Sequence, residues 1–452
     1  MRGRRVFSAW GSVLCGLLLS RCLALATWDD KLRAELDRSL RRYPATKTAA
    51  AVSGYLGRLL WRPRSVLIYD SRIFVSSEFL AKEKNKKHVN FVASVMTAGA
   101  LPNAAYLFEG NSTGYCSDDD AGLAPEKRLP CLVIAKRGGY KDPGVLVPNP
   151  YFHDLQFWNA VRTAVKSRAA KRPFAQRHPS VFWRGHLSAG LDWCPDEVGN
   201  FARLEAVSLS MDRGDVVDVR CWMLKKCVAR DPQKACAKQP YDDRMRAVQA
   251  DLRLVTVEAH VAKENFTAWQ YVLNLPGSST GSYSRNLNHL WFLGSVVVFW
   301  KASFVEWYFP ALQDGETHVV ADKQTLVSTI ERLNKDPAQQ KRLVANAGRV
   351  DEELVCPQCL ARYLRMVVDA LRQRFSLSTV LDDPCRARDL FQSLDCTGLE
   401  LHEVFPTVRQ NSAFDIEGRR LTTVATSKKL QGGCDVLIRH ATRACDRRTV
   451  AQ

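Results

Sequence analysis

The chain has 452 residues, too many for one ordinary core, and its 46% hydrophobic and 25% charged residues are typical of a globular protein. Its formal net charge of +18 suggests a nucleic-acid partner, but the basic residues are scattered and no DNA- or RNA-binding motif accompanies them. We therefore expect no nucleic acid. A solvated surface explains the charge first, and an anionic ligand or polysaccharide second.

The first 26 residues have the layout of a secretory signal peptide. A basic start, MRGRR, precedes an apolar run, and Ala24-Leu25-Ala26 provides a small-residue cleavage site. An uncleaved signal anchor is the alternative, because Arg21 and Cys22 interrupt the apolar run. No later stretch is long and apolar enough to span a membrane. We expect the chain in the lumen of the endoplasmic reticulum or Golgi, or secreted.

Glycosylation signals and cysteines agree with this compartment. Asn111 and Asn265 each begin an Asn-X-Thr or Asn-Ser-Thr acceptor sequence for N-glycosylation. Removal of Cys15 and Cys22 with the signal leaves twelve of the fourteen cysteines, an even number. In an oxidising compartment we expect several disulfides, although their connectivity cannot be deduced from the sequence.

After a helical lead-in over 27–62, short β-branched and aromatic runs alternate with helical patterns. We predict an N-terminal Rossmann-like domain over 63–245, with strands at 66–70, 105–108, 131–135, 145–148, 180–185 and 216–220. A C-terminal Rossmann-like domain follows over 246–375, with strands at 269–275, 295–300 and 317–321 and a closing helix. Residues 376–452 form a cysteine-containing tail of unknown fold. The predicted class is α/β, with two doubly wound domains facing a cleft.

Two stretches have the composition of an anion-binding site. LPGSSTGSYSRNLNHL (275–290) is a small, hydroxyl-rich loop between a strand and a helix, where backbone N–H groups and the helix dipole attract anions. Arg184 ends the strand SVFWRG, and its guanidinium fits phosphate oxygens bidentately. An ordinary polar loop and a structural ion pair are the alternative interpretations.

The same stretches resemble the protein O-glucosyltransferase and capsule-associated-protein family (Rumi-like, glycosyltransferase family 90, lipopolysaccharide-modifying). FWRG at 182–185, VLVPNPYF at 145–152 and the block YVLNLPGSSTGSYSRNLNHLWFLGSVVVFWKASFVEWYFPAL carry the resemblance, which covers roughly 95–365. It implies a GT-B fold that holds a UDP-sugar, usually glucose or xylose, in its cleft, with 63–245 as the acceptor domain and 246–375 as the nucleotide-sugar domain. Transfer would invert the anomeric centre without a metal or other cofactor, onto a hydroxyl of a protein or glycan.

The resemblance also assigns roles in UDP-sugar binding. It places the diphosphate between the FWRG stretch and the loop of the other domain, with Arg203 assisting and Glu306 contacting donor hydroxyls. The family's second arginine falls on Asn286, so the neighbouring Arg285 is its substitute. The implied binding residues are Arg184, Gly185, Arg203, Ser278, Ser279, Thr280, Gly281, Ser282, Ser284, Arg285 and Glu306.

The catalytic base is less clear, because the family's aspartate after a strand of the first domain is not in register here. Ungapped alignment puts Ser112 at its position. The nearby carboxylates, Glu109, Asp118 and Asp119, are candidates to deprotonate the acceptor hydroxyl. A catalytically inactive protein that binds a nucleotide sugar or glycan is the alternative.

Cys356-Pro-Gln-Cys359 has the spacing of a redox or zinc motif. A thiol oxidoreductase would place it at a helix start after the first strand of a thioredoxin-like unit, whereas here it follows the last helices of a domain. No second pair of cysteines or histidines supports zinc. We favour structural disulfides, and a CxxC thiol oxidoreductase remains a weaker alternative.

Overall fold

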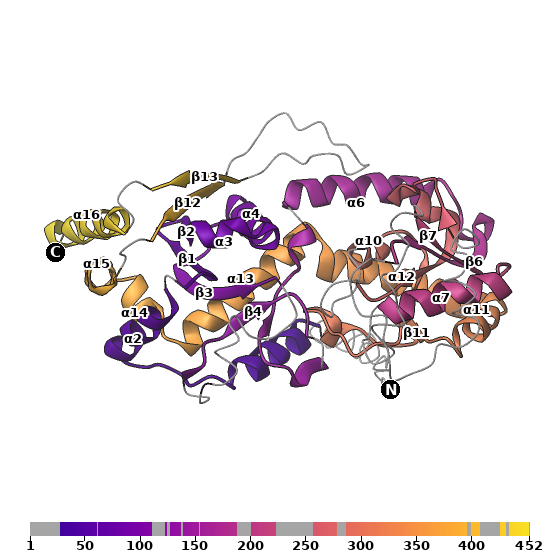
Figure 1. Cartoon of the computed structure of the whole chain (residues 1–452), viewed down its shortest axis with the longest axis horizontal. Coiled ribbons are helices and arrows are strands. Elements are labelled where there is room, and N and C mark those ends of the chain that lie inside the picture. Colours follow the sequence, from indigo (N-terminus) through magenta and orange to yellow (C-terminus); the bar gives the residue numbers. More distant parts are fainter. Residues whose placement is uncertain are drawn as a thin grey trace, which may run out of the picture.

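The protein is built on two β-sheets, as the computed structural model in Figure 1 shows. The elements of the seven-stranded sheet lie in its left part and those of the six-stranded sheet in its right part. We call these parts the first and second lobe. The structure describes residues 28–60, 62–110, 123, 127–136, 139–152, 154–187, 200–222, 256–277, 286–395, 399–406, 425–430 and 434–451. The predicted signal peptide lies outside this part.

The sheet of the first lobe is mixed, in the order β13-β12-β2-β1-β3-β4-β5. Only β3, β4 and β5 run parallel to one another, and the other neighbours are antiparallel. Asp70 and Ser71, both with positive φ, form the tight turn between β1 and β2. The strands are β1 (Ser65–Tyr69), β2 (Arg72–Ser76), β3 (Ala104–Glu109), β4 (Cys131–Val133), β5 (Val145–Leu146), β12 (Leu401–Pro406) and β13 (Ala425–Lys429).

The sheet of the second lobe is entirely parallel, in the order β11-β10-β9-β6-β7-β8. Counted along the chain this is the order 3-2-1-4-5-6 of dinucleotide-binding folds, with its switch point between β6 and β9. The strands are β6 (His178–Gly185), β7 (Val217–Trp222), β8 (Thr256–Val257), β9 (Trp269–Asn274), β10 (Val296–Trp300) and β11 (Val319–Ala321).

Helices cover both sheets. In the first lobe residues 28–40 are helical, followed by α2 (Ala49–Leu59), α3 (Ser77–Ala81), α4 (Glu83–Ala98), α13 (Pro357–Arg374), α14 (Ser378–Leu381), α15 (Pro384–Ser393) and α16 (Asp435–Ala451). In the second lobe lie α7 (Asn200–Asp212), α10 (Leu287–Leu290), α11 (Leu326–Asn334) and α12 (Pro337–Val350). Among the helices that the structure describes, none is long and apolar enough to cross a membrane.

Two segments carry the chain between the lobes. Helix α6 (Leu155–Ala170) leads from β5 to β6, and the π-helical segment η9 (Asp351–Val355) leads from α12 back to α13. One core cluster joins the first lobe to the face of the second sheet that carries Phe182, Val272 and Val297. The opposite face, with Val181 and Leu273, packs in a second cluster.

The two-lobed α/β class expected from the sequence is confirmed, with a doubly wound parallel sheet in the second lobe and a mixed sheet in the first, but the expected division at 245/246 is wrong. Strand β6 pairs with β9, so the second lobe begins at the predicted strand 180–185 and not after it. The tail is not separate either, because β12 pairs with β2 and extends the first sheet. Parallel neighbours are fixed by long-range pairing, which local sequence patterns do not reveal.

Candidate functional site at the switch point of the second lobe

The carboxyl ends of β6 and β9 meet at the switch point, the position where parallel α/β sheets bind ligands. Phe182 of β6 lies opposite Val272 of β9. Two residues further along, Arg184 and Asn274 therefore follow on the same face of the sheet, because side chains alternate with a period of two. Strand β6 ends one residue later, at Gly185, and β9 ends at Asn274 itself.

Arg184 is held by Asp218 of the neighbouring strand. Its Nη2 donates to Asp218 Oδ1 at 2.7 Å and its Nη1 to the Asp218 carbonyl at 2.7 Å, while the guanidinium lies 4.4 Å from the Phe182 ring centroid. Burial lowers the pKa of Arg184, and the charge of Asp218 opposes that effect. The Nε atom of Arg184 is buried without a hydrogen-bond partner.

Arg203 joins the two loops that leave β6 and β9. From α7 its Nε donates to the Pro276 carbonyl at 2.8 Å, and its Nη1 donates to the His186 carbonyl at 2.5 Å. Its guanidinium also lies 5.6 Å from the Trp183 ring centroid. Arg203 thus fixes the spacing of the two loops, and its expected part in binding the UDP-sugar stays a prediction.

Gly185 is required by the close approach of the Trp183 ring. A Cβ built on Gly185 would lie 2.4 Å from a carbon of that ring, so any other residue would displace the indole. The glycine therefore keeps the chain tight where it leaves β6.

Asn274 was not singled out by the sequence, and its environment is unusual. It is 0% exposed, and neither its Oδ1 nor its Nδ2 has a hydrogen-bond partner. Trp183 Nε1 and Arg184 Nε, at the end of the adjacent strand, are likewise buried without a hydrogen-bond partner. Folded proteins leave few such atoms, because each costs about 1–3 kcal/mol. The only sequence signal was an amide ending the apolar run YVLN before Pro276-Gly277.

Glu306 lies in a second buried polar group, formed with Asn149 and Asn288. Asn149 Nδ2 donates to Glu306 Oε2 at 3.3 Å and to Asn288 Oδ1 at 3.0 Å, and Asn288 Nδ2 donates back to Asn149 Oδ1 at 3.0 Å. Asn149 follows β5 and Asn288 belongs to α10, so this group joins the lobes. Burial raises the pKa of Glu306 to about 8, partly opposed by the Asn149 hydrogen bond.

Glu109, the first candidate base, ends β3 in the first lobe. Its carboxylate forms an ion pair with Arg64 at 2.5 Å, and the residue is only 5% exposed. The ion pair would have to open before this carboxylate could reach an acceptor hydroxyl. The other candidates, Asp118 and Asp119, lie outside the described residues.

The remaining site residues of the loop are also outside the described part: Ser278, Ser279, Thr280, Gly281, Ser282, Ser284 and Arg285. Because β6 and β9 are neighbours, Arg184 lies in the same lobe as the strand that precedes this loop, and the expectation that Arg184 belongs to the opposite domain is wrong. Asn286, at the loop's end, lies with its Nδ2 3.5 Å from the Arg184 carbonyl oxygen.

The modification sites are partly described. Asn265 is exposed on the 3-10 segment η7 (Lys263–Ala268), as an acceptor for N-glycosylation must be, and Asn111 lies outside the described residues. Disulfides are confirmed: Cys356 pairs with Cys359, and Cys385 pairs with Cys445. Cys131, Cys221 and Cys434 are disulfide-bonded as well. In the described part of the chain, no three His, Cys, Asp or Glu residues are grouped as metal ligands would be.

A cavity of about 640 Å³ lies elsewhere, between the helix of 28–40 and the end of α13. Arg41, Lys47 and Arg374 line it, but the Nε of Arg374 donates to the Tyr43 carbonyl at 3.0 Å. Cations at helix C-termini neutralise the helix dipole. We therefore assign Arg41 and Arg374, at the carboxyl ends of the helix of 28–40 and of α13, to helix capping.

Comparison with known proteins gives only distant likenesses. No protein-family model and no curated protein matches the chain. Among solved structures it is similar to HepE of Anabaena in complex with UDP, at 12% identity and a TM-score of 0.34, over 64% of this chain and 77% of that one. A HepE complex with UDP and glucose is 13% identical with a TM-score of 0.32, over 64% of this chain and 68% of that one. TarM is 11% identical with a TM-score of 0.26, over 43% of this chain and 36% of that one.

Proposed function

We propose that this chain is a glycosyltransferase that moves a hexose or pentose, with glucose or xylose favoured, from a UDP-sugar to a hydroxyl of a protein or glycan acceptor. One observation carries the proposal. The buried polar atoms of Asn274 and Arg184 that lack partners lie on the same face of the sheet at the switch point, where a bound ligand would complete their hydrogen bonds.

The chemistry of these groups suits a nucleotide sugar. A carboxamide offers a donor and an acceptor side by side, which matches sugar hydroxyls or the imide edge of a pyrimidine. Arg184 brings a cation to the same sheet face. A diphosphate there could accept a hydrogen bond from the Arg184 Nε and compete with Asp218 for the Nη donors. A leaving diphosphate stabilised by such groups needs no metal, and inverting transfer without a cofactor is part of the proposal.

The compartment is also part of the proposal. The amino-terminal signal, the exposed acceptor Asn265 and the disulfides agree with a place in the endoplasmic reticulum, the Golgi or outside the cell. Acceptors there are glycoproteins or polysaccharides.

A second function, binding of the nucleotide sugar without turnover, is favoured by one specific observation. Glu109, the candidate base inside the described residues, is ion-paired with Arg64 and nearly buried. Such a protein would keep the whole switch-point site and lack only the proton transfer from the acceptor.

Calorimetry and UDP release together test both functions. UDP, UDP-glucose and UDP-xylose are titrated into the full-length secreted protein, and UDP release is followed with and without acceptor glycoproteins. Binding with acceptor-stimulated release supports the transferase. Binding without release across the panel supports the second function, and a protein that binds none of the three nucleotides contradicts both.

A further inference from the structure

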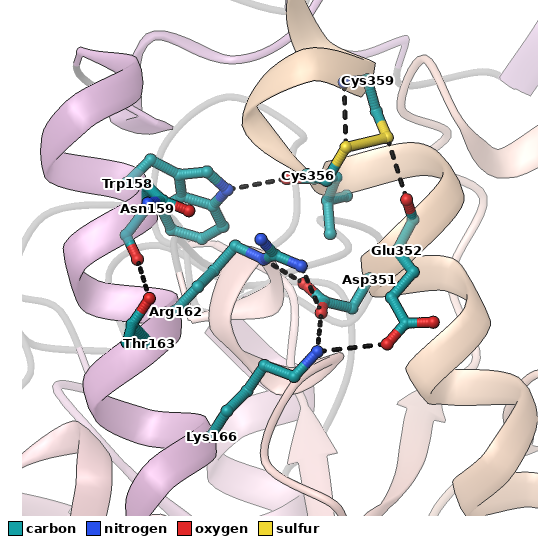
Figure 2. Close-up of polar contacts among 10 residues, drawn as sticks. Trp158, Asn159, Arg162, Thr163, Lys166, Asp351, Glu352, Cys356 and Cys359 are labelled. Carbon is teal, nitrogen blue, oxygen red and sulfur yellow. Dashed lines mark hydrogen bonds and ion pairs between the residues drawn. A yellow bond between two sulfur atoms is a disulfide. The ribbon is translucent and has the colours of Figure 1, made fainter.

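The two segments that carry the chain between the lobes are fastened to each other. Figure 2 shows Arg162 and Lys166 of α6 directed at Asp351 of η9. Arg162 donates from Nε and Nη2 to the two carboxylate oxygens at 2.6 and 2.7 Å, and Lys166 Nζ lies 3.1 Å from Oδ2. Trp158 Nε1 donates to the Val355 carbonyl at 2.7 Å. We call this region the crossing.

A disulfide lies directly after the crossing, at the start of α13. Cys356 is the N-cap residue of that 18-residue helix, Pro357 occupies its first turn, and the Cys356 sulfur is bonded to the sulfur of Cys359. The Cys359 N–H lies 3.0 Å from Cys356 Sγ, and Cys359 Sγ lies 3.2 Å from the Glu352 carbonyl oxygen. The disulfide therefore contacts η9 on one side and the helix start on the other (Figure 2).

These contacts suit the reduced pair as well as the oxidised one. After reduction, Cys356 still accepts the Cys359 N–H at the positive end of the helix, an environment that stabilises a thiolate. The Cys359 thiol can donate its hydrogen to the Glu352 carbonyl, which already lies within reach. Neither sulfur loses its neighbours, so the helix start does not have to unfold when the bond breaks.

The other described disulfide closes a much longer stretch of chain. Cys385 and Cys445 are separated by 60 residues and join α15 to α16. Such a bond closes a long loop and stabilises the fold through the entropy of the unfolded chain. The Cys356–Cys359 bond closes only a four-residue turn, so global stability is a weak reason for its presence.

We propose that Cys356 and Cys359 form a reversible dithiol–disulfide couple that exchanges with small thiols of the glutathione class and controls the rigidity of the crossing. The cysteines are 9% and 7% exposed, which admits a small thiol more readily than the disulfide of another protein. This site is therefore distinct from an oxidoreductase that acts on protein substrates.

The exchange balances in two steps. A small thiolate attacks the sulfur of Cys359, the protein S–S bond breaks, and Cys356 leaves as a thiolate stabilised at the helix start. A second small thiolate then attacks the small-molecule sulfur of the mixed disulfide and releases Cys359. The protein gains two thiol groups, and the two small thiols leave as one oxidised disulfide, with their protons transferred to the cysteines.

Reduction should loosen the crossing because the disulfide braces its last residue. Val355, which accepts the Trp158 indole, directly precedes Cys356, and Glu352 contacts Cys359. With the bond open, the turn between η9 and α13 regains rotational freedom, while the Arg162–Asp351 pair continues to hold the other end. The prediction is a local change at the crossing in a protein that stays folded.

Wild-type protein in glutathione buffers of increasing reducing strength tests this directly. Alkylation followed by mass spectrometry counts the thiols of each pair, and amide hydrogen exchange follows residues 351–360. We expect the Cys356–Cys359 pair to open reversibly before Cys385–Cys445, with at least tenfold faster exchange at 351–360 and no change in circular dichroism. If the two pairs open only together on unfolding, or exchange at 351–360 is unchanged by reduction, the proposal fails.

Two double variants provide a matched comparison without reductant. Cys356→Ser with Cys359→Ser removes the bond but keeps a serine, a favoured N-cap residue, at the helix start. It should reproduce the faster exchange of the reduced protein. Cys385→Ser with Cys445→Ser should leave exchange at 351–360 unchanged. Neither measurement uses a nucleotide sugar, so the outcome is independent of the proposed transferase.

Discussion

Arg184 and Asp218 bridge neighbouring parallel strands, with a 2.7 Å contact from Nη2 to Oδ1. The pair lies at the switch point, so it has two possible roles, a structural ion pair or a cation held ready for an anionic ligand. The side chains of Arg184 and Asp218 are 11% and 20% exposed. An incoming phosphate could therefore compete with Asp218 for the Arg184 guanidinium.

Replacement of Arg184 separates these roles. Arg184→Ala should weaken UDP binding at least tenfold, about 1.4 kcal/mol, because the diphosphate loses its cation. Asp218→Asn should bind UDP as tightly as wild type or more tightly, since the competing carboxylate is gone. Calorimetry measures both, and Arg213→Ala, at an exposed pair with Asp215, is the control. Unchanged affinity in Arg184→Ala would show that the pair is structural only.

Asn274 leads to a prediction in which stability and binding change in opposite directions. Asn274→Leu has a similar shape and removes two buried polar atoms that lack partners, so the unliganded protein should gain about 1–3 kcal/mol in unfolding free energy. The same change should weaken UDP-sugar binding at least tenfold, because the carboxamide no longer meets the ligand. Urea denaturation and calorimetry measure the two effects.

The control for this variant is Asn334→Leu, which removes an amide that accepts from Tyr271 and donates to the Pro179 carbonyl. That substitution should destabilise the protein and leave binding unchanged. An Asn274→Leu protein that is less stable than wild type would contradict the assignment of Asn274 as a group waiting for a ligand.

Loss of Arg162 should cost far more than loss of an exposed arginine. Asp351 is 0% exposed, and Arg162→Ala leaves its carboxylate with Lys166 alone, so we expect a loss of roughly 3 kcal/mol in unfolding free energy. Arg342→Ala, which removes an exposed pair with Glu316, should cost less than about 1 kcal/mol. Equal losses in denaturant titrations would rule out the crossing as a buried electrostatic contact.

The strands of this fold follow from local patterns, but their neighbours do not. The apolar runs at 66–70, 105–108 and 295–300 predicted β1, β3 and β10, because β-branched and aromatic residues favour buried strands. The same pattern could not assign β6 to the second lobe, since parallel partners lie far apart in sequence. For this reason the sequence pattern placed Arg184 in a different domain from β9, although the two strands are neighbours.

Site residues divide in the same way. Arg184 was found because a charge at the end of an apolar run is visible in the sequence, and Glu306 because its stretch resembles the glycosyltransferase family. Asn274 was missed, since an amide at a strand end is unremarkable until its burial and lack of partners are known. Asp351 was missed for the same reason, because its burial against α6 depends on how two distant helices pack.

Glu306 should make stability depend on pH in a definite direction. Its pKa is about 8 in the folded protein against an ordinary 4.5, so between these values the folded state holds a proton that the unfolded state releases. The unfolding free energy therefore falls as pH rises from about 4.5 to about 8, by up to roughly 1.4 kcal/mol per unit. Glu306→Gln stays neutral and can still accept from Asn149, so it should lack this dependence.

Urea titrations at pH 5, 6.5 and 8 should show the variant gaining on wild type at each step, while the exposed change Glu316→Gln runs parallel to wild type. If the unfolding free energies of Glu306→Gln and wild type also change in parallel with pH, Glu306 is ionised in the folded protein. The assignment of a buried neutral carboxyl would then be wrong.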